Sequence, residues 1–77
     1  MNNSSEHILS TGDGRPYTLV PLRDTAVILG MTVQGLGIWR HTGYGPASVL
    51  IGRKRFYRSC DLDNFLNELF EEAQVAA

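Results

Sequence analysis

Residues 24–40 constrain this chain more than any other stretch, because two apolar-periodic segments follow each other there almost without a gap. Gly30 ends the first segment, and Thr32 offers a side-chain oxygen that can cap the second. A glycine that closes one helix and a threonine that opens the next, one residue apart, indicate a helix-turn-helix. Because the turn is too short for an independent loop, the two helices are expected to cross steeply and pack directly.

Apolar periodicity predicts a first helix over about residues 21–29 and a second over about residues 32–42. Pro21 suits the first helical position, where its missing N–H costs nothing. The side chains expected to face the core are Leu22, Ala26 and Leu29 from the first helix and Val33, Leu36 and Trp39 from the second. The opposite face of the second helix is then left to solvent, as in a helix that reads DNA.

Two glycines, Gly35 and Gly37, lie inside the second predicted helix, where each costs roughly 1 kcal/mol relative to alanine. Either the helix tolerates them because Leu36 and Trp39 hold it to the core, or the bare backbone lets the helix approach a DNA groove closely. A nucleotide-binding glycine loop is excluded, because the third glycine and a preceding buried strand are both missing.

Residues 48–58 predict a β-hairpin with its hinge at residues 52–54, and that hinge is strongly basic. Alternation along the second strand puts Phe56 and Tyr57 on opposite faces and does not decide which one is buried. A charged two-stranded tip beside a helix-turn-helix is typical of a wing. The pattern therefore predicts a small α+β fold of the winged helix-turn-helix type.

Outside this pattern, the sequence predicts two unstructured ends, a short segment before the first helix, and a third helix. Residues 1–16 are polar and glycine-rich and are predicted to be a mostly disordered N-terminal arm, and residues 71–77 a frayed tail. Residues 17–70 form the predicted winged-helix domain, in which residues 17–20 are either a short strand or a hydrophobic staple. A third helix begins at Ser59 as its cap, and its apolar stripe closes the core through Leu62, Phe65, Leu66 and Leu69.

The charge of the chain is unevenly distributed, although the net charge is only −1. Residues 25–60 contain five basic residues and no acidic one, whereas the rest of the chain has two basic and eight acidic residues. A local charge of this size is an electrostatic footprint for phosphate, or else a solvated basic face without a partner.

The sequence gives little support for an enzyme, a metal-binding protein or a membrane protein. The single cysteine, Cys60, excludes an internal disulfide and a cysteine-rich zinc site, and neither His7 nor His41 has a carboxylate or cysteine placed beside it. We therefore expect no enzyme activity, no metal and no cofactor. No run approaches the ~20 apolar residues of a membrane span, and residues 1–16 lack the apolar core of a secretory signal, so a cytoplasmic protein without a membrane partner is expected.

Over residues 20–69, the sequence resembles the small winged-helix domain of bacteriophage excisionases and their relatives in the MerR-like superfamily, including the AlpA-type regulators. The residues that carry the resemblance are Ala26, Leu29, Gly30, Thr32, Leu36, Trp39, Arg40, Gly43, Gly45, Pro46, Ile51, Gly52, Arg53, Tyr57, Arg58, Ser59, Asp61, Leu62, Phe65 and Leu66. The resemblance implies a helix in the major groove of DNA and a wing near the minor groove.

Matched onto this chain, the major-groove positions of the family fall on Gln34, Gly35, Ile38 and His41, with Arg40 nearby, and the wing position falls on Arg53, flanked by Lys54 and Arg55. The predicted DNA-binding residues also include Thr32 and Gly37 of the second helix. Gln34 can pair bidentately with adenine. Family members usually carry longer polar or basic side chains where this chain has Gly35, Gly37 and Ile38. Recognition through the backbone or through DNA shape therefore gains weight over base readout.

The resemblance implies an excisionase, a recombination directionality factor that binds and bends attachment-site DNA and directs a phage integrase toward excision in the bacterial host cytoplasm. The expected partners are double-stranded DNA with attachment-site repeats, the integrase, and further copies of the chain in tandem, because no long helix is predicted after Leu69. One alternative is a small AlpA-like or MerR-like transcriptional regulator. Another is a protein-interaction module that uses the aromatic side chains of Tyr44, Phe56 and Tyr57.

Overall fold

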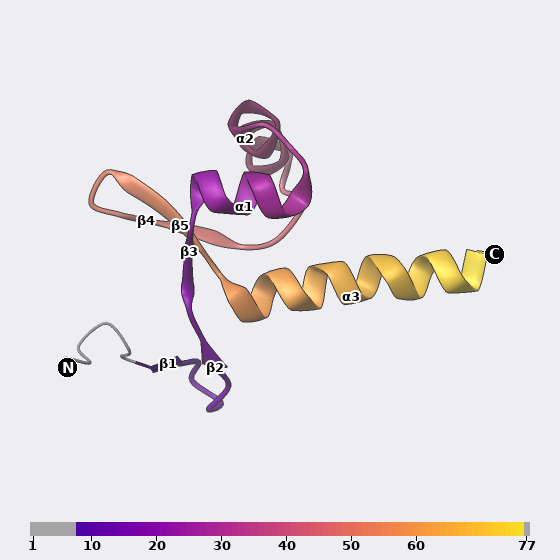
Figure 1. Cartoon of the computed structure of the whole chain (residues 1–77), viewed down its shortest axis with the longest axis horizontal. Helices are drawn as coiled ribbons and strands as arrows, with labels where there is room; N and C mark the ends of the chain where they lie inside the picture. The colour runs from indigo at the N-terminus through magenta and orange to yellow at the C-terminus, as the bar shows by residue number, and fades with distance from the viewer. Residues whose placement is uncertain (1–7, 77) are drawn as a thin grey trace.

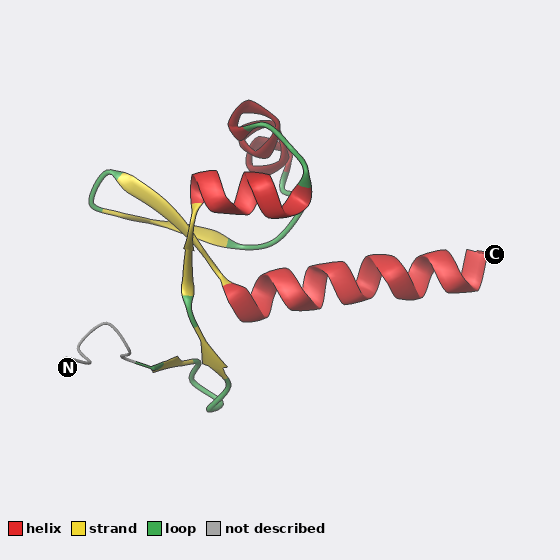
Figure 2. Ribbon diagram, in the orientation of Figure 1, coloured by secondary structure: helices red, strands yellow, loops and turns green. Residues whose placement is uncertain are grey.

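Three helices and two small antiparallel sheets form an α+β arrangement in the computed structural model, which describes residues 8–76 (Figures 1 and 2). The elements in chain order are β1 (Leu9–Ser10), β2 (Pro16–Tyr17), β3 (Leu19–Pro21), α1 (Leu22–Leu29), α2 (Val33–Thr42), β4 (Ser48–Ile51), β5 (Lys54–Arg58) and α3 (Ser59–Ala76). The bounds of α1, α2, β4 and β5 agree with the sequence predictions to within about one residue.

The turn between α1 and α2 forms as the sequence predicts. Gly30 takes the left-handed conformation with φ 67°, and the N–H of Met31 donates to the carbonyl of Ala26 at 2.8 Å. The side-chain oxygen of Thr32 accepts from the N–H of Gly35 at 2.9 Å and so caps α2. Pro21 differs from its prediction, because it is the N-cap of α1 and not its first residue, and it pairs with Phe56 in the sheet.

The larger sheet has the strand order β3-β5-β4, with β5 at its centre. β4 and β5 form the predicted hairpin, in which Ile51 pairs with Lys54 across a two-residue turn that begins with Gly52 at φ 64°. β3 pairs with the other edge of β5, so residues 19–21 are a strand and not only a staple.

The core lies where α1, α2 and α3 meet the inner face of this sheet. Its fully buried members include Leu36, 1% exposed, and Tyr57, 2% exposed, together with Ala26 and Leu62. Tyr57 is therefore the buried member of the Phe56–Tyr57 pair. The surface that the interaction-module hypothesis built from Tyr44, Phe56 and Tyr57 does not form, because Tyr57 is inside.

The predicted apolar stripe of α2 is correct at its centre and wrong at one end. Leu36 is buried and Trp39 is half-buried against the core, but Val33 is 43% exposed. A spacing of three residues advances about 300° around a helix of 3.6 residues per turn. Val33 and Trp39 therefore lie on opposite sides of Leu36, and only Trp39 reaches the core.

The prediction of a mostly disordered arm is wrong for residues 9–16, while residues 1–7 lie outside the described residues. β1 and β2 pair antiparallel, with Leu9 opposite Tyr17. The hydroxyl of Thr11 accepts from the N–H of Arg15 at 2.9 Å, and Gly14 supplies the left-handed conformation that the tight turn needs, with φ 91°.

The prediction that the chain frays from residue 71 is also wrong, because α3 continues for seven residues beyond Leu69. α3 runs for 18 residues to Ala76, which is about 27 Å at 1.5 Å per residue, and its second half projects away from the rest of the molecule (Figure 1). The Ser59 hydroxyl does not cap this helix as predicted. It accepts from the N–H of Thr18 at 2.9 Å and so ties the start of α3 to the segment before β3.

Candidate nucleic-acid interface

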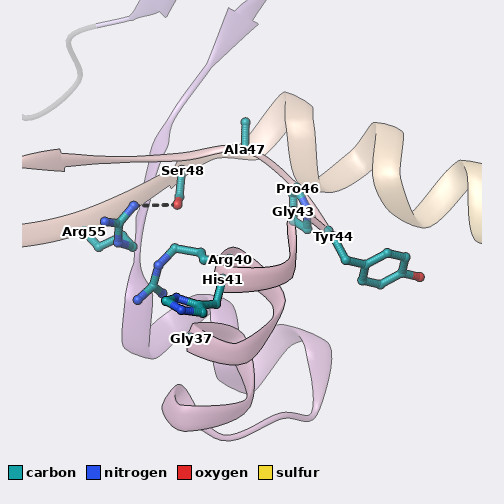
Figure 3. A pocket seen from close by; sticks show the side chains of 10 residues that line it. Gly37, Arg40, His41, Gly43, Tyr44, Pro46, Ala47, Ser48 and Arg55 are labelled. Carbon is teal, nitrogen blue, oxygen red and sulfur yellow. Dashed lines mark hydrogen bonds between the residues drawn. The ribbon is translucent and has the colours of Figure 1, made fainter.

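A groove of about 520 Å³ lies between the C-terminal half of α2 and the β4–β5 hairpin (Figure 3). Arg40 and His41 reach it from the last turns of α2, and Arg55 reaches it from β5. Figure 3 shows these three side chains converging on the same side, while the ring of Tyr44 points away from them. None of the described residues that line this groove is acidic.

The hairpin holds Arg55 in place. Nη1 of Arg55 donates to the Ser48 hydroxyl at 2.8 Å, and the two residues lie on the same face of the hairpin as buried Tyr57. Fixing one edge of the guanidinium leaves its other N–H groups for a ligand. A planar guanidinium with free donors suits phosphate oxygens.

The positive charge of Arg40 and His41 also favours the end of α2. Both lie in the last turn of α2, where positive charge complements the negative end of the helix dipole. The carbonyls of Arg40 and Trp39 are already satisfied by the N–H groups of Gly43 and Tyr44, at 3.2 and 2.9 Å. The two side chains are therefore not needed to cap α2.

The exposed face of α2 carries most of the other predicted contacts. Gln34, Ile38 and His41 are exposed and share one face at spacings of four and three residues. Thr32 is exposed at the start of α2, but its hydroxyl is engaged by the N–H of Gly35. These predicted contact residues thus form one continuous strip along α2, from its N-terminus to the groove.

The two glycines of α2 differ in their surroundings. A Cβ on Gly35 would lie 3.2 Å from both the Met31 methyl and the Thr32 hydroxyl, so packing at the helix start explains a glycine there. The nearest atom to a Cβ on Gly37 would be Nη2 of Arg40 at 3.7 Å, which is an ordinary contact. Nothing within residues 8–76 requires glycine at position 37, and Gly37 borders the groove.

The three basic residues at the hairpin are divided between two depressions, and Arg55 borders both. Alternation along β5 places Lys54 with Phe56, on the face opposite to Arg55. Arg53 is exposed in the turn, and with Lys54 and Arg55 it borders a second depression of about 620 Å³ beside the start of α1. The structure therefore brings Arg40, His41 and Arg55 together in the first groove, while Arg53 and Lys54 border only the second depression.

The fifth basic residue of the central stretch is used internally. Nε of Arg58 donates to the Asp61 carboxylate at 2.7 Å, and the guanidinium lies 5.3 Å from the centre of the Tyr17 ring. The hydrogen bonds to Asp61 raise the pKa of the Arg58 guanidinium. Four basic side chains, those of Arg40, Arg53, Lys54 and Arg55, remain for an external anion.

An aromatic cluster below the groove fixes the end of α2 and was not anticipated from the sequence. Trp39, Tyr44 and Phe65 meet edge to face, with ring centroids 4.9 to 5.7 Å apart. Gly45 closes over them at φ 90°, and a Cβ there would lie only 2.6 Å from Cε3 of Trp39. Ser48 was missed as well, although a serine and an arginine on one hairpin face are a readable signal.

Within residues 8–76, no group of three or more His, Cys, Asp or Glu side chains is arranged to hold a metal ion. Across the same residues, no helix combines the length and the apolar character that crossing a membrane requires.

No protein family and no curated protein matches this chain, and no solved structure matches it either.

Proposed function

We propose that this chain is a winged helix-turn-helix protein that binds double-stranded DNA, with α2 as the recognition helix and the β4–β5 hairpin as the wing. The observation that supports this most is the groove in which Arg40, His41 and Arg55 converge without an acidic neighbour among its lining residues. It continues the exposed strip of α2, so one surface offers both a helix for the major groove and cations for the flanking phosphates.

In this proposal, the basic side chains contact DNA phosphates and a different side chain contacts the bases. Arg40 and Arg55 meet phosphate oxygens beside the groove entered by α2, and Arg53 at the hairpin tip reaches phosphate or a narrow minor groove. Gln34 is the side chain available for base readout, through adenine. Gly37 brings the backbone close to the duplex, and shape contributes to recognition where the side chains are short.

The proposed role is that of an excisionase in a bacterial cytoplasm, which binds repeated sites in attachment-site DNA, bends them, and biases an integrase toward excision. A single copy presents one short helix and one hairpin, so its specificity is modest and several adjacent copies are needed. The cost of bending is offset by the additional backbone contacts.

A small transcriptional regulator is the second candidate, and the length of α3 favours it. Its exposed second half supplies a helix that a symmetric dimer could use at a palindromic promoter site. A regulator would act on two half-sites and would need no integrase.

The test of the role is an integrase-dependent excision assay, run together with circular-permutation gel shifts that report bending. The excisionase role predicts excision that depends on this protein, inhibited integration, and bent complexes. Equal excision with and without the protein, and unaffected integration, would refute the role. Duplex binding in the gel shifts would then leave the DNA-binding proposal standing.

A further inference from the structure

The free end of the β4–β5 hairpin is a two-stranded ribbon with exposed apolar side chains on both of its faces. β3 pairs with β5 only as far as Phe56, so residues 50–55 extend beyond the third strand, and this end projects past α1 (Figure 1). Leu50 is 60% exposed on the inner face, and Val49 and Ile51 are 53% and 50% exposed on the outer face. A run of three exposed apolar residues is a defect in a soluble fold unless it serves a function.

The same end of the hairpin carries a concentrated positive charge. Arg53, Lys54 and Arg55 follow the apolar run after one glycine, and residues 48–58 include no acidic residue. Within residues 8–76, the ion pairs that form do not use any of these three side chains. Apolar and cationic groups are therefore offered side by side, which suits a partner that presents apolar surface next to fixed negative charge.

Apolar side chains on both faces of the ribbon indicate insertion into a groove, because a flat partner surface would cover only one face. The minor groove of DNA combines the two required properties, since its walls are the apolar faces of the deoxyriboses and its rims carry the phosphates. In the proposed function α2 occupies the major groove, and the next groove along the duplex is a minor groove. The inference below rests on that function.

The thickness of the ribbon does not fit an undistorted minor groove. Stacked sheets pack about 10 Å apart, and this spacing sets the thickness of a ribbon that has side chains on both faces. The minor groove of B-form DNA is only about 6 Å wide. Entry of the ribbon therefore has to widen the groove, and apolar side chains that widen it in this way partly unstack a base step.

We infer that Leu50 and Ile51 form an apolar wedge that enters the minor groove, partly unstacks one base step and kinks the duplex toward the major groove. Val49 packs on a deoxyribose of the groove wall, and Arg53 holds a phosphate of the rim. The bend of the proposed role then arises at one base step and not as smooth curvature along the site. Pyrimidine–purine steps are the preferred place for the wedge, because they unstack most easily.

The test combines two fluorescence measurements on a short duplex. Energy transfer between dyes at its two ends reports bending, and 2-aminopurine placed at successive positions brightens where a base step unstacks. The wedge variant is Leu50→Thr with Ile51→Thr, which removes the apolar surface and keeps side chains that suit a strand. Val27→Thr with Ile28→Thr is the matched control, because it removes two exposed apolar side chains from α1. Circular dichroism checks folding, and Leu50→Thr alone is used if the double change does not fold.

The wild type and the control should bend the duplex by at least about 20° and brighten 2-aminopurine at the step where the wedge enters. The wedge variant should lose both signals, whereas its affinity should keep the same dependence on salt, because no phosphate contact is removed. Binding of the wild type without unstacking, or unstacking by the wedge variant as large as that by the wild type, would overturn the inference and leave DNA binding standing. A wild type that does not bind the duplex would refute the proposed function itself.

Discussion

The central part of this chain and its C-terminal helix contrast in both burial and charge. Residues 25–60 carry five basic residues and no acidic one, and they include the buried Leu36 and Tyr57. After Cys60 the chain has five acidic residues and no basic one, and residues 67–75 are exposed. The net charge of −1 therefore hides a basic central region and an acidic C-terminal helix.

The largest expected difference between the two regions is in stability. Leu36→Ala should lower the free energy of unfolding by about 2–5 kcal/mol, because it leaves a cavity in the core. A domain of this size has only about 3–5 kcal/mol in total, so the variant should be mostly unfolded. Phe70→Ala in α3 should cost less than about 0.5 kcal/mol, because its side chain is exposed. Urea unfolding followed by circular dichroism measures both, and similar midpoints for the two variants would contradict the contrast.

The joint between the two regions should be the next most sensitive place. Gly45→Ala forces a Cβ into Trp39 and a positive φ on an L-residue, so it should cost about 1–3 kcal/mol. The change should also lower the near-ultraviolet signal of Trp39, which packs on Phe65 of α3. Gly43→Ala is the control with positive φ but open space, and it should cost less. Equal losses for the two variants would show that the contact with Trp39 is unimportant.

The salt dependence of DNA affinity should change when a basic residue of the central region is replaced, and it should not change when an acidic residue of α3 is replaced. With four available basic side chains, the logarithm of affinity should fall with the logarithm of salt concentration at a slope near about −3.6. Arg55→Ala should flatten that slope by about 0.9 and weaken binding roughly tenfold in low salt. Glu71→Gln in α3 should leave the slope unchanged. Fluorescence anisotropy with a short duplex measures both, and equal effects from Arg55→Ala and Glu71→Gln would argue against the groove.

The smallest effect concerns Gly37. Gly37→Ala should stabilise α2 by up to about 1 kcal/mol, because a Cβ there meets only an ordinary contact. If the backbone approaches DNA closely at this position, the same change should weaken binding in spite of the gain in stability. A more stable variant with unchanged DNA affinity would show that α2 merely tolerates this glycine and that it has no role in DNA binding. Ala73→Gly, in the exposed half of α3, is the matched control and should leave affinity unchanged.

Local signals predicted the central region well. Gly30 and Thr32 located the turn between α1 and α2, and Gly52 located the hairpin, because each acts through backbone geometry within a few residues. The pairing of β3 with β5 was left open by the sequence, since it joins residues nearly forty positions apart. Tyr57 and not Phe56 lies in the core because its side of β5 packs against Ala26, Leu36 and Leu62 of the three helices.

The extent of α3 was missed for a different reason. Residues 68–74 are rich in glutamate, alanine and glutamine, which are strong helix formers, so the signal was present. Such propensity can sustain a helix that is already nucleated by packing at Leu62. At the site, Arg58 was counted with the available cations, yet Asp61 three positions later offered a visible internal partner.

The most direct test of DNA binding through α2 and the hairpin is a titration of isotope-labelled protein with a short duplex, followed by the backbone amide signals of each residue. The proposal predicts that the largest shifts fall on Gly37, Ile38 and His41 of α2 and on Arg53 and Arg55 of the hairpin. Residues 71–75 of α3 should stay unchanged. Shifts concentrated in α3, or no shift at all in low salt, would contradict it.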